Sequence, residues 1–388
     1  MAGMKMDDIF KFAQDIRNKI TEEELKMGHF NIIITGKTGV GKSTLINSVF
    51  RESIAVTGVG RPVTQRTRMI EKQGVPLRIF DTKGLELGNT AQEDVRNDIY
   101  ELIDWQLKSK DPDKFIHSIW YCISTTSDRI EEEEINWINE LATKAQHDVP
   151  VIIVLTKTIS RKKGLALKSQ IENMNINVRG VVPVLAEPYE VDIGEETKMV
   201  SPFGLTELIG VTLQVVPESA RNALINAQSV DLDLKGKRAQ KWLAGFAASN
   251  FAAGFIPFPI ADAPVLITTE ISMLAKITTV FGIDMDKGML AAVVSAIVGC
   301  SGATIGGRFA ASNLMKLIPG IGTVMGGLVN GTAAAAFTVA LGEAYIVIMT
   351  MIAKGEIRRE EISQQQFIDQ MKDIFMDKLT HTRIPMKD

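Results

Sequence analysis

The sequence predicts an α/β domain with a mostly parallel sheet and helices on both faces, followed by an all-α domain of apolar helices. Short apolar runs alternate with helical patterns from about residue 30 to residue 216, which is typical of a parallel sheet. A glycine-rich motif follows the first of these runs, and after residue 241 the composition changes to mostly Ala, Gly, Ile, Val, Leu and Met. We therefore expect an N-terminal helix within residues 1–29, a first domain at 30–216 and a helical domain at 217–388.

Residues 7–26 have the spacing of a helix. Apolar side chains recur there at Ile9, Phe10, Phe12, Ala13, Ile16 and Ile20. This pattern predicts an amphipathic helix docked on another domain. Residues 356–378 form a second charged amphipathic pattern, and we expect the two helices to cover each other's apolar faces.

Five apolar runs predict the buried strands of the sheet. They lie at residues 30–35, 76–80, 117–123, 149–155 and 181–185. Four consecutive glutamates at residues 131–134 precede a helical pattern, and acidic side chains are favoured in the first turn of a helix by its dipole. We therefore expect a helix to begin there.

Composition and charge limit the classes of function. The 388 residues carry a formal net charge of −3, so no basic surplus indicates a nucleic-acid partner, and none is expected. The two cysteines, Cys122 and Cys300, lie far apart in apolar surroundings, which suits core thiols in a reducing compartment. Residues 1–30 carry charges throughout and lack the apolar stretch of a secretory signal, so we expect a cytoplasmic protein.

The glycine-rich motif predicts a phosphate-binding loop, and so a P-loop NTPase domain. Every position of the pattern G-x-x-x-x-G-K-[ST] is filled, and Thr44 continues into a helical segment. Backbone N–H groups of such a loop surround the β-phosphate, Lys42 neutralises the β and γ oxygens, and the Ser43 hydroxyl binds Mg²⁺. The predicted nucleotide-binding residues here are Gly36, Lys37, Thr38, Gly39, Val40, Gly41, Lys42, Ser43 and Thr44.

Two further segments favour a GTPase over other NTPases. Asp81 and Gly84 lie in a D-x-x-G sequence directly after the strand at 76–80, where the carboxylate holds Mg²⁺ and the glycine N–H meets the γ-phosphate. The polar loop between the two motifs contains Thr64, our candidate for the switch threonine that joins the Mg²⁺ shell only with triphosphate bound. Thr67 is the alternative to Thr64.

With these motifs, residues 30–216 resemble the translation-factor-like class of P-loop GTPases, the relatives of Era and TrmE. The wording of the P-loop, GKTGVGKST, is also similar to that of septin-like and immunity-related GTPases. Residues 254–264, with Met273 and Phe281-Gly282, resemble an uncharacterised apolar helical domain that follows such GTPases in bacteria. The resemblance implies GTP and GDP as ligands, Mg²⁺ as cofactor and a two-part architecture.

The base-recognition motif departs from that of the family. Thr156 and Lys157 begin an [NT]-K-x-D motif after the strand at 149–155, but Ile159 occupies the place of the aspartate that accepts hydrogen bonds from guanine. Such bonds are worth about 1.5–3 kcal/mol each, so we expect a weakened guanine preference unless Ser160 or another group substitutes. Ala186 matches the alanine whose N–H meets the guanine oxygen in the family.

Two other departures concern hydrolysis. Leu85 follows the D-x-x-G sequence where Ras-like enzymes place a water-orienting glutamine, so we expect slow intrinsic hydrolysis unless Glu86, a switch residue or a second subunit completes the site. Gly39 stands where TrmE-type loops carry an asparagine, so the resemblance does not extend to activation by potassium. Activation by dimerisation through the nucleotide domains stays open. Lys42 and Thr64 are the predicted catalytic residues, and Ser43, Thr64 and Asp81 the predicted Mg²⁺ ligands.

The helical domain predicts contact with membrane lipid. Charge-free runs at residues 242–261, 288–307 and 317–342 reach the length that spans a bilayer, about 20 residues, although prolines and many glycines interrupt them. A tight bundle core is the other interpretation, because small residues also allow close packing of helices. We expect a membrane-associated switch that hydrolyses GTP. The alternatives are a nucleotide-gated helical effector or pore with little turnover, and a ribosome-assembly GTPase.

Overall fold

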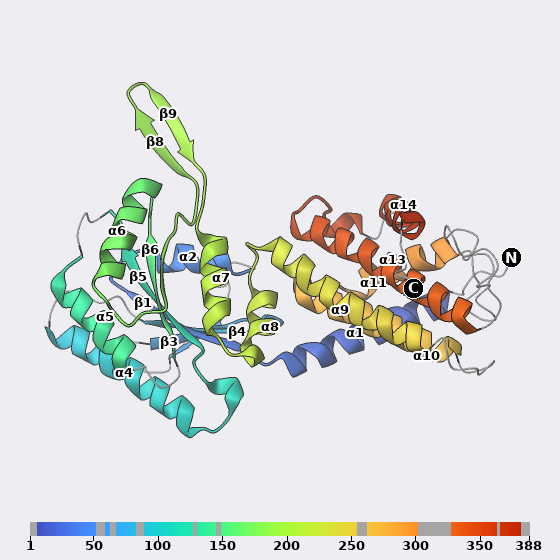
Figure 1. The fold of residues 1–388 in the computed structure, drawn as a ribbon, viewed down its shortest axis with the longest axis horizontal. Coiled ribbons are helices and arrows are strands. Elements are labelled where there is room, and N and C mark those ends of the chain that lie inside the picture. Colours follow the sequence, from blue (N-terminus) through green and yellow to red (C-terminus); the bar gives the residue numbers. More distant parts are fainter. Residues whose placement is uncertain are drawn as a thin grey trace. The chain divides into compact units, whose positions relative to one another are not determined.

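The chain folds into two compact units, which we call the sheet unit and the helical unit. The computed structural model describes residues 6–51, 59–62, 67–82, 89–126, 130–144, 149–253, 262–301, 327–362 and 365–381. The sheet unit is Met27–Asp231, and the helical unit joins Met1–Lys26 to Leu232–Asp388. This division groups residues 217–231 with the sheet and the N-terminal helix with the helical unit. Figure 1 shows the elements of each unit.

Within the described residues, seven strands form one sheet in the order β2-β3-β4-β1-β5-β6-β7. β1 pairs in parallel with β4 and β5, and β6 continues the parallel arrangement from β5 to β7. The predicted α/β fold with a mostly parallel sheet is therefore confirmed. The five parallel strands are β1 Phe30–Gly36, β4 Leu77–Thr82, β5 Ser118–Ser124, β6 Val151–Thr156 and β7 Gly180–Pro183.

Helices cover both faces of the sheet. On one face, side chains such as Ile33 and Ile153 form an apolar core with α4, α5 and α6. On the other face, Trp120 donates its indole N–H to Thr212 Oγ1 of α7 at 3.1 Å and stacks on Phe50, with ring centroids 5.7 Å apart. The helices are α2 Lys42–Val49, α4 Asn89–Lys108, α5 Glu132–Lys144, α6 Arg161–Asn173, α7 Leu205–Val215 and α8 Glu218–Ala227, with a 3-10 turn, η1, at Pro112–Lys114.

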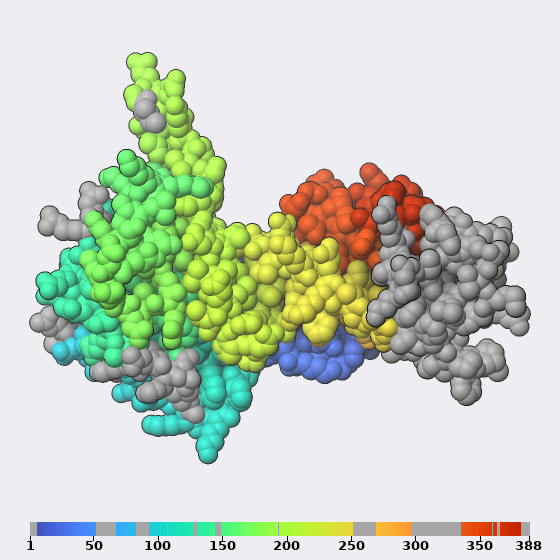
Figure 2. Space-filling model, viewed as in Figure 1, coloured from blue at the N-terminus to red at the C-terminus, as the bar shows by residue number. Residues whose placement is uncertain are grey.

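Four strands were not predicted. β2 Val59–Pro62 and β3 Thr67–Glu71 extend the sheet beyond β4 as antiparallel strands, with β2 at the edge, in a segment that the sequence presents as a polar loop. β8 Tyr189–Ile193 and β9 Glu196–Val200 form a separate hairpin, which projects from the sheet unit in Figures 1 and 2. Its signal was present: alternating side chains flank Gly194, which has the positive φ of 67° that two-residue hairpin turns favour.

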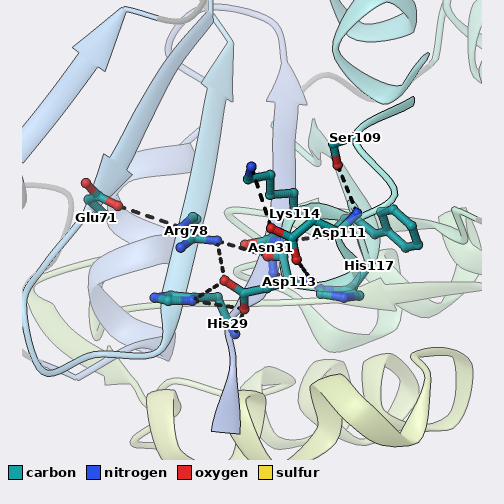
Figure 3. Close-up of polar contacts among 10 residues, drawn as sticks. His29, Asn31, Glu71, Arg78, Ser109, Asp111, Asp113, Lys114 and His117 are labelled. Carbon is teal, nitrogen blue, oxygen red and sulfur yellow. Dashed lines mark hydrogen bonds and ion pairs between the residues drawn. The ribbon is translucent and has the colours of Figure 1, made fainter. Parts of the chain in front are cut away.

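The amino edge of the sheet is held by a polar cluster (Figure 3). Asp113 accepts the backbone N–H of His29 at 2.6 Å and lies 3.1 Å from Arg78 Nη1. Burial favours the neutral form of Asp113, but the bonds and charges of His29 and Arg78 outweigh it and lower the pKa. Burial lowers the pKa of His117 to about 4, so its Nδ1 is free to accept the Asn31 N–H at 3.0 Å. The cluster fixes the start of β1, at the edge opposite the P-loop.

The helical unit is built around α13. α9 packs against α10 and α13, while α14 packs against α11 and α13. A Cβ on Gly342 of α13 would lie 2.2 Å from Leu243 Cδ1, so glycine permits the close approach to α9. The unit contains α9 Leu232–Ala253, α10 Asp262–Phe281, α11 Lys287–Ser301, α13 Gly327–Ala353, η3 Arg359–Glu361 and α14 Gln365–His381.

The N-terminal helix, α1, is Met6–Met27, close to the predicted bounds. Glu23 forms an ion pair with Lys276 of α10, and Lys287 of α11 lies over the Phe10 ring, 5.6 Å from its centroid. Its partners are therefore α10 and α11. We expected the N-terminal helix to cover the apolar face of the C-terminal helix. In the structure, α11 and α13 cover that face of α14 instead.

One segment in the described part of the chain is long and apolar enough to cross a membrane. It is Ala335–Ala353 of α13, and 61% of its apolar window is buried inside the structure. A core helix of a bundle has the same properties. Parts of the three predicted charge-free runs, residues 254–261, 302–307 and 317–326, lie outside the described residues.

Candidate functional site: a nucleotide-binding edge

The P-loop lies between the end of β1 and the start of α2, at the carboxyl edge of the sheet, where ligands of open parallel sheets bind. Gly36 pairs with Cys122 of β5, and a Cβ on Gly36 would lie 2.3 Å from the Cys122 carbonyl oxygen. Gly41 begins α2 in a left-handed conformation, with φ 100°. These two glycines are required by a close approach and by backbone geometry respectively.

Lys42 points back over the loop. Its Nζ donates to the Gly36 carbonyl at 3.0 Å and to the Lys37 carbonyl at 3.4 Å. Thr38, Gly39 and Ser43 are exposed, so the loop is open to a ligand. The N-terminus of α2 adds the partial positive charge that favours a phosphate.

Asp81 fits a Mg²⁺ ligand. It is the penultimate residue of β4 beside β1, in register with Ile34, and its Oδ1 is buried without a hydrogen-bond partner among the described residues. Burial raises the pKa of Asp81, while the charges of Lys42 and Arg68 lower it. A buried carboxylate oxygen without a donor is costly unless a cation or a water bound to it satisfies it, and Mg²⁺ takes oxygen ligands. Among the residues present, Asp81 and the exposed Ser43 suit that ion.

The segment predicted to contact the base, at Thr156 and Lys157, lies against the P-loop. Thr156 Oγ1 donates to the Val40 carbonyl at 2.6 Å, and Lys157 Nζ donates to the Gly39 carbonyl at 2.7 Å, so both residues brace the P-loop. The Thr158 N–H donates to the Val184 carbonyl at 3.0 Å, which ties this loop to the strand end before Ala186. The structure thus brings the two predicted base loops together.

Neither Ile159, at the position of the missing aspartate, nor the following Ser160 restores the acceptor in this structure. Ile159 is half-buried and apolar. Ser160 caps α6, and its hydroxyl oxygen accepts the Lys163 N–H at 3.4 Å. The Ser160 side chain is therefore engaged in a helix cap in this structure.

Two predicted site residues, Thr64 and Gly84, lie outside the described residues, as do Leu85 and Glu86. Their assignments stay predictions. Thr67, the alternative switch threonine, begins β3 opposite Thr82, and only 2% of its surface is exposed. A threonine buried in a strand in this way contributes to the sheet, which favours Thr64 over Thr67 for the switch role.

Sequence reasoning missed a contact of the P-loop with α5. Lys37 Nζ lies 2.9 Å from Glu131 Oε2 and 3.0 Å from Glu134 Oε2. The glutamate run does form the acidic first turn of α5, as predicted, but its position beside the P-loop depends on the sheet order and is not encoded in the local sequence.

Comparison with known proteins shows what this region is similar to. Residues 31–157 match the family described as "50S ribosome-binding GTPase". Translocase of chloroplast 108 from Physcomitrium patens is 36% identical over 94 residues, which are 24% of this chain and 9% of that protein. Septin-9 from Rattus norvegicus is 29% identical over 162 residues, 35% of this chain and 28% of that protein. The tRNA modification GTPase MnmE from Vesicomyosocius okutanii is 29% identical over 184 residues, 42% of this chain and 40% of that protein. The match spans less than a third of the length of the first two relatives.

Proposed function

We propose that the P-loop GTPase domain formed around residues 31–157 is a GTP-hydrolysing switch whose nucleotide state is coupled to a lipid-associated helical unit. The predicted GTPase domain itself is confirmed by the family match and by the GTPase relatives. The observation that carries the proposal for the site is the buried, unpartnered Oδ1 of Asp81 beside a complete P-loop. That arrangement suits a metal–phosphate ligand at this edge.

In this proposal the residues of the P-loop supply most of the chemistry. Backbone N–H groups of the loop hold the β-phosphate, and Lys42 exchanges its two carbonyl partners for phosphate oxygens. Ser43, Asp81 and Thr64 would hold Mg²⁺, which would neutralise negative charge on the phosphate oxygens. The Gly84 N–H meets the γ-phosphate. Because Leu85 cannot orient water, turnover by the chain alone is slow.

The helical unit is the proposed output. Its apolar composition and the Ala335–Ala353 segment support contact with membrane lipid from the cytoplasmic side. GTP and GDP are the proposed ligands, and a homodimer through the nucleotide domains is the proposed means of completing the hydrolytic site. No nucleic acid is proposed as a partner, since the net charge of −3 gives no electrostatic basis for one.

A second candidate function is a nucleotide-gated helical effector with little turnover. Leu85 favours it, since a leucine after the D-x-x-G sequence removes the side chain that usually orients the attacking water. In that case binding of GTP, and not its hydrolysis, sets the state of the helical unit.

Steady-state GTP turnover by the full chain, measured with and without liposomes at several protein concentrations, separates these functions. Turnover that rises with protein concentration or with lipid supports the switch. Tight GTP binding with negligible turnover under every condition supports the gated effector. Absence of GTP binding would contradict both.

A further inference from the structure

We infer that Lys37, held by Glu134, which in turn is held by Tyr121, is a positioning residue that pre-forms the P-loop before nucleotide binds. The inference deepens the proposed function, since it rests on nucleotide binding at this loop. Lys37 is the first variable residue of the motif, a loop whose backbone N–H groups cradle phosphates. Its side chain is directed elsewhere.

The Lys37 ammonium is bound by two carboxylates of the α5 N-terminus. Glu131 Oε2 and Glu134 Oε2 lie 2.9 and 3.0 Å from Nζ. Burial opposes the charged lysine, but the two carboxylates outweigh it and raise the pKa of Lys37. Lys37 is therefore a fixed cation whose charge is already balanced by protein.

Glu134 is a rigid anchor, whereas Glu131 is exposed. The side chain of Glu134 is 7% exposed, and its Oε1 accepts the Tyr121 hydroxyl at 3.0 Å. Tyr121 belongs to β5, is 1% exposed, and its ring lies 4.9 Å from that of Trp137. The chain of contacts therefore runs from the core of the sheet to the P-loop.

The backbone of Lys37 shapes the phosphate site. Its carbonyl oxygen accepts Lys42 Nζ at 3.4 Å and the Val40 N–H at 3.3 Å. Fixing the Lys37 side chain thus fixes a carbonyl that aims the phosphate-binding lysine and closes the turn. A loop ordered in advance loses less entropy on binding, which strengthens binding of any ligand that uses it.

This mechanism predicts a specific pattern of nucleotide affinities. The P-loop contacts the β-phosphate, which GDP and GTP share, so loosening the loop weakens both ligands equally. If Lys37 instead bound the γ-phosphate directly, its removal would weaken binding of the triphosphate only. Removal of Glu134 also distinguishes a positioning role of Lys37 from direct phosphate binding. A lysine that binds phosphate would reach it more readily once released from Glu134, so binding would become tighter and not weaker.

The test is calorimetric binding of GDP and of a non-hydrolysable GTP analogue, with Mg²⁺, to the full chain. We expect Lys37→Met and Glu134→Gln each to weaken both ligands by about tenfold, and the double variant to be no weaker than the worse single one, because both changes break one contact chain. Tyr121→Phe keeps the packed ring and is expected to weaken binding of both nucleotides by a few-fold. Lys37→Arg keeps the charge and is expected to retain most of the affinity. Glu132→Gln, an exposed glutamate of the same turn, is the matched control and leaves affinity unchanged.

Unchanged or tighter binding by Glu134→Gln would overturn the inference, as would a loss confined to the triphosphate in Lys37→Met. Tyr121→Phe and Lys37→Arg preserve volume or charge, so they decide the matter even if Lys37→Met fails to fold. Failure of the proposed function is seen separately, as absent turnover by the unaltered chain with nucleotide binding intact.

Discussion

Lys42 shows how a single side chain is prepared for its ligand. Its Nζ already donates to two carbonyls of the P-loop, which in the proposed function are the partners that phosphate oxygens would replace. We predict that Lys42→Ala abolishes tight triphosphate binding while the core is retained, because the β and γ charges lose their main counterion. Calorimetry measures the affinity, and circular dichroism checks the fold. Unchanged affinity would remove the P-loop from the mechanism.

Thr64 and Thr67 are distinguished by the same reasoning. Thr64→Ala is expected to leave GDP binding nearly intact and to reduce GTP hydrolysis, since a switch threonine engages Mg²⁺ only in the triphosphate state. Thr67 is buried in β3, so Thr67→Ala is expected to lower thermal stability instead. Single-turnover kinetics and melting curves of both variants test the assignment, and an exchange of the two phenotypes would reverse it.

Ile159 tests base recognition. Because no carboxylate stands at this position and Ser160 caps α6, we expect GTP-over-ATP selectivity to be poorer than with the complete motif. Ile159→Asp is expected to raise it by about tenfold or more, the value of one charged hydrogen bond. Competition binding measures the ratio. A native preference above about a thousandfold would require an acceptor elsewhere in the site.

At the scale of elements, the sequence predicts what is locally encoded. The parallel strands were predictable because runs such as residues 149–155 are apolar on both faces, as a strand covered on both sides requires. β2 and β3 were not, because both strands contain polar residues, such as Arg61 and Arg68, in a pattern that is also typical of a loop. The positions of Lys42, Asp81 and Thr156 on one edge followed from the parallel topology. The Lys37–Glu134 contact did not, because it joins segments far apart in the sequence.

α9, α10 and α13 enclose the carboxyl group of Glu270, which lies on α10. Thr338 Oγ1 donates to Glu270 Oε1 at 2.7 Å, and Asn250 Nδ2 lies 3.2 Å from the same oxygen. Glu270 Oε2 and Asn250 Oδ1 are buried without partners among the described residues. Two other charged residues, Lys276 of α10 and Glu343 of α13, are engaged elsewhere, with Glu23 and with Lys378 respectively. Burial raises the pKa of Glu270 to about 7, against the lowering effect of Thr338.

This carboxyl makes the stability of the helical unit depend on pH. The folded pKa lies above the unfolded one, so the folded state binds the proton more tightly, and ionisation of Glu270 destabilises it. Its cost is absent below about pH 4.5, grows through pH 7 and is then constant, at up to about 3 kcal/mol. We predict that Glu270→Gln removes this decline, while Glu343→Gln, which is partly exposed, does not. Denaturant titrations of the full chain from pH 5 to pH 8 measure the difference, and parallel curves for Glu270→Gln and the unaltered protein would contradict it.

For the whole molecule, the sheet unit is proposed to bind nucleotide and the helical unit to contact lipid, and the composition predicts two such domains. The change after residue 241 predicted a helical domain, but it did not reveal that residues 217–231 belong to the sheet unit, or that Met1–Lys26 belongs to the helical unit. Asn226 explains the first point: its Oδ1 accepts Arg51 Nη2 at 2.8 Å, and Phe50 forms a β-bridge with Gln228. Both are contacts between distant segments, which local composition does not encode.

Binding to lipid is expected to distinguish the full chain from the sheet unit alone. Met27–Asp231 contains the P-loop, Asp81 and both base loops, so this unit produced alone is expected to bind nucleotide with the affinity of the full chain. The full chain is expected to float with liposomes and to remain bound at high salt, because apolar burial is not screened as charge pairing is. The sheet unit alone is expected to stay unbound. If the full chain is monodisperse without detergent and does not float in either nucleotide state, the Ala335–Ala353 segment serves as the core of a bundle, and the lipid part of the proposed function is wrong.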